Sequence, residues 1–195
     1  MKKVYFFILI LYLLYLLYAC RPNESRTITN EAPNDTTHFF EVAQYIKTQI
    51  SEVNKTPYFI YKIDITNGKK DSSTINTSVF NQIAAQFLTP DLNDNDLKKR
   101  YTENIFHDQT TKSFTISYTA TDKELEIQNI EVLLQEDGQT VKRLFIRKFF
   151  NYTDSSAIEQ LSWKPGESFQ INRLVQKPGN KENSYLTNVV WNEKR

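Results

Sequence analysis

The chain has 195 residues, of which 24 are basic and 23 acidic, so its formal net charge is +1. This balance lacks the excess of lysine and arginine with which proteins bind nucleic-acid phosphates, and we expect no nucleic-acid partner. A chain of this length with 39% hydrophobic residues is sufficient for one globular domain with its own core.

The first twenty residues have the layout of a secretory signal peptide. Lys2 and Lys3 precede an unbroken apolar run over residues 4–19, and the run stops at Cys20, the only cysteine. The segment Leu17-Tyr18-Ala19-Cys20 resembles the processing site of bacterial lipoproteins. The resemblance implies that residues 1–19 are removed and that Cys20 carries diacylglycerol and an amide-linked acyl chain. An uncleaved transmembrane anchor is the alternative, although such an anchor needs about 20 apolar residues.

A lipid anchor of this kind implies a place in the bacterial cell envelope, with the membrane itself as a partner. Arg21 follows the cysteine, where inner-membrane lipoproteins of the best-studied bacteria have aspartate, so the outer membrane is the preferred location. Residues 20–37 then form a flexible tether, in which Ile28 is the one large apolar residue. Residues 38–195 form the single predicted domain.

Hydrophobic spacing predicts two amphipathic helices at the start of this domain. Apolar residues recur every three or four positions over residues 39–53 and again over 79–88. A strand over 58–66 lies between them and ends at Asn67-Gly68, which favours a tight two-residue turn. Seven further strands are predicted near residues 101–108, 112–120, 124–136, 139–150, 157–164, 167–177 and 184–192.

The turns between these strands have recognisable chemistry. Residues 164–167 and 177–180 each hold Pro-Gly at their centre and predict type II turns. Asp137-Gly138 predicts a two-residue hairpin, which would place Val132 opposite Arg143 and Ile130 opposite Phe145. A phase slip after Ile127 predicts a β-bulge. We therefore expect an α+β fold, with N-terminal amphipathic helices on an antiparallel meander of about seven strands, flat or curved.

Residues for catalysis are scarce. The only histidines are His38 and His107, and no nucleophile elbow, zinc-protease pair, phosphate loop or dinucleotide glycine motif occurs. His107 is expected to lie on the surface. Residues 91–96 resemble the opening of a calcium-binding loop but lack its glycine and glutamate. We expect no catalytic residue, cofactor or metal, although scattered carboxylates leave a hydrolase open: Glu103, Glu126, Glu131 and Glu159.

One basic segment is a candidate ligand-contact patch. Lys142, Arg143, Arg147 and Lys148 alternate with apolar and aromatic residues, a combination that can bind phosphates, lipid headgroups or acidic glycans. The alternative is that each charge simply lies on the wet face of a strand.

Three classes of function remain. A non-catalytic lipoprotein whose sheet binds a protein or glycan partner comes first, and a carrier of a lipid or other hydrophobic ligand comes second. An envelope hydrolase comes third, since the separation of its carboxylates cannot be read from the sequence.

Overall fold

The computed structural model describes residues 39–88 and 99–192 of the chain. The N-terminal part consists of helix α2 (Val42–Lys55), a hairpin of strands β1 (Ile60–Thr66) and β2 (Lys69–Ile75), helix α3 (Thr77–Ala84) and the short 3₁₀ helix η1 (Ala85–Leu88). Seven strands follow: β3 (Tyr101–Asp108), β4 (Ser113–Ala120), β5 (Ile127–Leu134), β6 (Val141–Asn151), β7 (Ser156–Lys164), β8 (Ser168–Gln176) and β9 (Asn183–Val190).

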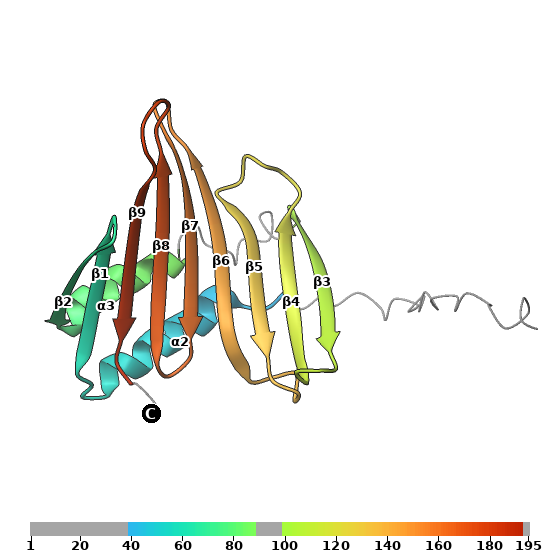
Figure 1. Ribbon diagram of the computed structural model, residues 1–195. Coiled ribbons are helices and arrows are strands. Elements are labelled where there is room, and N and C mark those ends of the chain that lie inside the picture. The colour runs from blue at the N-terminus through green and yellow to red at the C-terminus, as the bar shows by residue number, and fades with distance from the viewer. Residues whose placement is uncertain (1–38, 89–98, 193–195) are drawn as a thin grey trace, which may run out of the picture. The chain divides into compact units, whose positions relative to one another are not determined.

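All of these strands belong to one antiparallel sheet (Figure 1). Its order is β2-β1-β9-β8-β7-β6-β5-β4-β3, so the last strand of the meander returns to pair with the first strand of the chain. At this junction the Thr187 hydroxyl donates a hydrogen bond of 2.7 Å to the Asp64 carboxylate. Contacts between residues this distant in sequence make the sheet one continuous unit.

The expected fold class was wrong, because the described part of the chain is a mainly-β fold with two short α-helices on a nine-stranded sheet. The seven predicted strands from residue 101 onward are present, but they are not the whole sheet. The hairpin β1–β2 extends it by pairing with β9. Strand β2 has the sequence KKDSSTI, and its lack of apolar alternation explains why no strand was predicted there.

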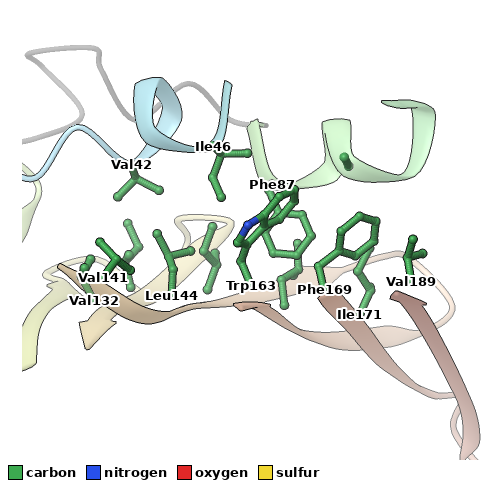
Figure 2. Close-up of a cluster of buried hydrophobic side chains, with 14 of the residues drawn as sticks. Val42, Ile46, Phe87, Val132, Val141, Leu144, Trp163, Phe169, Ile171 and Val189 are labelled. Atoms are coloured by element: carbon green, nitrogen blue, oxygen red, sulfur yellow. The ribbon is translucent and has the colours of Figure 1, made fainter. Parts of the chain in front are cut away.

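Both α-helices lie on the same side of the sheet (Figure 1). Helix α2 buries Val42 and Ile46 on the stripe that the spacing predicted. The Asn76 side chain begins α3 by accepting a hydrogen bond of 3.0 Å from the Val79 N–H. The space between helices and sheet is filled by aromatic rings (Figure 2): Phe87 meets Trp163 edge-on at 5.1 Å, and Trp163 stacks on Phe169 at 5.1 Å.

The hairpin between β5 and β6 differs from its prediction. Gln135 and Thr140 are hydrogen-bonded across a longer turn in which the Asp137 carboxylate accepts from Thr140 N–H. The register shifts between Leu133 and Leu134, so that Val132 faces Leu144 rather than Arg143. This shift keeps the apolar residues of both strands on the helix side, and burial of those residues outweighs the simpler turn. The bulge predicted after Ile127 is confirmed.

The other predicted turns are confirmed. Thr66 pairs with Lys69 across Asn67-Gly68, and both turn residues have positive φ. Glu167 N–H and Asn180 N–H close the two Pro-Gly turns, whose glycines also have positive φ.

Candidate functional site: a groove on the open face of the sheet

The sheet has one face packed against α2 and α3 and a second face, here called the open face, on the opposite side. Strand β6 alternates between them, since Leu144 and Ile146 are buried on the helix side while Phe145 and Arg147 are exposed. The shift in register between Leu133 and Leu134 sets this alternation. Arg143 therefore also points to the open face, where it lines the same groove as Phe145 and Arg147.

Two rows of mainly polar side chains cross the middle of the open face. Paired positions place Asn129 beside Arg147, Arg147 beside Gln160 and Gln160 beside Asn172, which spans β5 to β8. The neighbouring row consists of Glu131, Phe145, Ser162 and Gln170 on the same strands. Asparagine is depleted in β-strands generally, so its presence on β5 and on β8 goes against local preference. Departures of this kind are expected where a surface has a function.

These rows line a groove of about 370 Å³. Within it, the Arg143 guanidinium donates a hydrogen bond of 3.3 Å to the Ser162 hydroxyl and lies 5.9 Å from the centre of the Phe145 ring. Arg147 has no ion-pair partner among the residues that the structure describes. Two arginines face one carboxylate, Glu131, so the groove has a net positive charge. Its amides and hydroxyl can both donate and accept hydrogen bonds.

Apolar side chains surround the groove on the same face. Phe149 and Ile158 occupy paired positions on β6 and β7 and are 37% and 41% exposed. Farther along the open face, beyond β8 and β9, Tyr61 of β1 is 53% exposed. Ile63 and Ile65 follow it on the same face of that strand. The open face therefore offers aromatic and aliphatic surface next to its polar centre.

The structure divides the predicted basic patch between two environments. Arg143 and Arg147 line the groove, and Lys142 is exposed within the bulged part of β6. Lys148 points the other way and is 3% exposed; its ammonium lies 3.3 Å from the Glu126 carboxylate and donates a 2.9 Å hydrogen bond to the carbonyl of Gln86 in η1. Lys148 thus holds η1 against the sheet and is not part of the groove.

The carboxylates considered for hydrolysis are also separated. Glu131 lies in the groove, and Glu103 is exposed on β3. Glu126 and Glu159 do line a common hollow on the helix side, but each forms an ion pair with a basic side chain. Glu126 pairs with Lys148, and Glu159 pairs with Arg173 at 3.0 Å. This charged cluster joins β6, β7 and β8 to η1, and we interpret it as structural.

The remaining candidate residues lie on the surface or outside the described part of the chain. His107 is exposed and stacks on Phe114 with ring centres 4.2 Å apart. Cys20, His38 and the acidic segment 91–96 lie outside the described residues. Within residues 39–88 and 99–192, no group of three or more metal-ligating side chains occurs. No described helix is long and apolar enough to cross a membrane.

No protein-family model, curated protein or solved structure matches the chain. What the protein does must therefore be inferred from its own residues.

The sequence alone identified the two arginines but missed the polar residues around them. Asn129, Gln160 and Asn172 alternate with buried apolar neighbours, as do the outward residues of most half-buried strands. Their one distinctive signal is asparagine inside a strand. Bringing them together requires the register of four strands, including a bulge whose position depends on packing.

Proposed function

We propose that the chain is a non-catalytic, membrane-anchored lipoprotein of the bacterial envelope, and that its open face binds an acidic glycan. The observation that carries the proposal is the groove over β5 to β8, where two arginines, a phenylalanine ring and a row of amides are exposed together. Each of these groups matches one part of such a ligand.

The arginines supply the preference for an acidic ligand. A guanidinium can form two parallel hydrogen bonds to one carboxylate, and Arg147 carries no competing ion pair among the described residues. Arg143 is held in place by its hydrogen bond to Ser162. The one acidic residue in the groove, Glu131, does not cancel both charges.

The amides and the ring supply the preference for a sugar. Side-chain amides both donate and accept, as sugar hydroxyls do, and Asn129, Gln160 and Asn172 are spaced along one row. The flat Phe145 ring, 37% exposed, offers an apolar surface for the C–H face of a sugar. A row that crosses several strands suits a linear chain of sugar units.

The test is calorimetric titration of the full chain in detergent with galacturonate hexamer, using the neutral maltohexaose as the matched ligand. We expect binding of the acidic hexamer only. Arg147→Ala should weaken binding about tenfold or more, because a charge-assisted hydrogen bond contributes about 1.5–3 kcal/mol. Arg147→Lys should be intermediate, since it keeps the charge but not the two-pronged geometry. Lys69→Ala, on β2, is the control and should bind as wild type does.

Equal binding of both hexamers, or of neither, would overturn the glycan proposal. Native mass spectrometry of the purified chain distinguishes the glycan proposal from the carrier hypothesis. An extra mass that extracts into organic solvent favours a carrier. The anchor is tested by Cys20→Ala, which should abolish lipid processing and leave an uncleaved precursor that still carries residues 1–19 and therefore runs at a higher mass than the processed wild type.

A further inference from the structure

The two outer edges of the sheet differ in how well they are protected from pairing with another strand. No described strand pairs with the outer side of β2 or of β3. Strand β2 begins with Lys69, Lys70 and Asp71, all exposed. Charged side chains of this kind are a common means by which edge strands avoid pairing with other chains.

Strand β3 lacks this protection at its centre. Ile105 and Phe106 are neighbours in the middle of the strand and are 59% and 60% exposed, on opposite faces of the sheet. The only carboxylates, Glu103 and Asp108, lie to either side of this pair. An uncharged, apolar strand centre of this kind is a template for strand addition.

The backbone direction of β3 can be derived from its pairing with β4. The Arg100 carbonyl accepts a hydrogen bond of 2.9 Å from the Thr121 N–H, and the register runs from there without a shift. In an antiparallel pair, successive residues direct their N–H and C=O groups alternately toward and away from the partner. Glu103, Ile105 and His107 therefore present both backbone groups at the free edge.

We propose that β3 pairs with β3 of a second copy of this chain, in an antiparallel dimer whose two-fold axis is perpendicular to the sheet and passes beside Ile105. In this register, every backbone hydrogen bond between the two chains forms between residues whose N–H and C=O groups point to the free edge. It places Ile105 opposite its own copy, and it places Glu103 of each chain opposite His107 of the other. The imidazole can then donate a hydrogen bond to the carboxylate, which also interacts with the Tyr118 hydroxyl of its own chain, so the edge complements itself in hydrogen bonding and shape.

Two features of β3 suit this arrangement. The His107 ring is already held by stacking on Phe114, which lowers the entropy lost on pairing. On the open face, Phe106 lies opposite Asn104 of the other chain and diagonal to the second Phe106, within reach of an aromatic side chain. A perpendicular two-fold axis also keeps both open faces on one side, so both grooves would face the same way.

Disulfide crosslinking tests the dimer and its register at once. Opposed Cα atoms in a hydrogen-bonded pair are about 5.5 Å apart, within the range that a disulfide spans. After mild oxidation of the full chain in detergent, Ile105→Cys should run at twice the chain mass on a denaturing, non-reducing gel. Phe106→Cys, which has no cysteine opposite it, and Ser73→Cys on β2 should form no crosslink and run at the mass of one chain, as should wild type, whose only cysteine is Cys20.

Sedimentation equilibrium supplies the second measurement, with detergent matched in density. Wild type should have twice the chain mass, and Ile105→Lys should have the mass of one chain while keeping the wild-type circular dichroism spectrum. A wild-type chain that sediments as a monomer would overturn the proposal. So would an Ile105→Cys chain that crosslinks only to another envelope protein, or a Phe106→Cys chain that crosslinks equally well.

Discussion

At the scale of single residues, the tyrosines on the helix side of the sheet have a structural role. The Tyr118 hydroxyl accepts a hydrogen bond of 2.8 Å from the Phe40 N–H, and its ring stacks on Phe39 at 3.9 Å. Tyr101 donates a hydrogen bond of 2.8 Å to the carbonyl of Ile127. These contacts fix the start of α2 and the edge of the sheet to the core.

Tyr101 provides a test through the pH dependence of stability. Burial raises the pKa of Tyr101 to about 12, above the value of about 10 of an unfolded tyrosine. Above pH 10 the unfolded state therefore binds fewer protons than the folded state, and the free energy of unfolding falls as pH rises. Tyr101→Phe should be less stable than wild type by about 1 kcal/mol at pH 8, since one hydrogen bond is lost.

We expect the difference in stability between wild type and Tyr101→Phe to narrow between pH 10 and pH 12, as measured by urea unfolding at several pH values. Tyr61→Phe is the matched control, because its side chain is more than half exposed on the open face. A Tyr101→Phe difference that stays constant over this range would show that the Tyr101 hydroxyl is not shielded by the fold.

At the scale of elements, strand β6 separates a structural charge from a binding charge at adjacent positions. Lys148 is buried against η1 and Glu126, whereas Arg147 faces the groove on the other side. Lys148→Ala should lower the free energy of unfolding by about 3 kcal/mol, because it removes a buried side chain with its ion pair and its hydrogen bond to η1 and leaves a void. Arg147→Ala should change stability by about 0.5 kcal/mol or less.

Urea unfolding of both variants and of Lys148→Met checks this assignment. The methionine retains most of the buried stem, and Glu126 is exposed enough to be hydrated, so Lys148→Met should lose less stability than Lys148→Ala. If Arg147→Ala were the more destabilising change, the two faces of β6 would be assigned wrongly.

Among the elements, those marked by turn residues and alternating side chains could be predicted from the sequence. Strands β3 to β9 were predictable because turn residues and alternating side chains mark each one, and the bulge after Ile127 showed as a break in that alternation. The register shift between Leu133 and Leu134 was not predictable, because its position depends on how Val132 and Leu144 pack beneath α2. The groove therefore could not be assembled from the sequence, although Arg143 and Arg147 were both named.

At the scale of the whole molecule, the fold depends on contacts between the two ends of the described chain. Strand β1 pairs with β9, and Trp191 beside β9 packs edge-on against Phe80 of α3 at 5.4 Å. The helix α2 is also tied to the sheet where the Gln49 side chain accepts a hydrogen bond of 3.2 Å from the Gly166 N–H. Neither helix has a core of its own, so helices and sheet should form and unfold together.

Both tryptophans, Trp163 and Trp191, lie in the layer between helices and sheet, and their fluorescence reports on its packing. We therefore expect tryptophan emission and far-ultraviolet circular dichroism to change at the same urea concentration in a single transition. Pairing between β1 and β9 closes a loop of more than a hundred residues, so refolding should take milliseconds to seconds. If circular dichroism changed before tryptophan emission, part of the secondary structure would unfold without disturbing the core. That part would have to lie outside the layer between helices and sheet, because loss of the helices would expose Trp163 and Trp191 and change their emission.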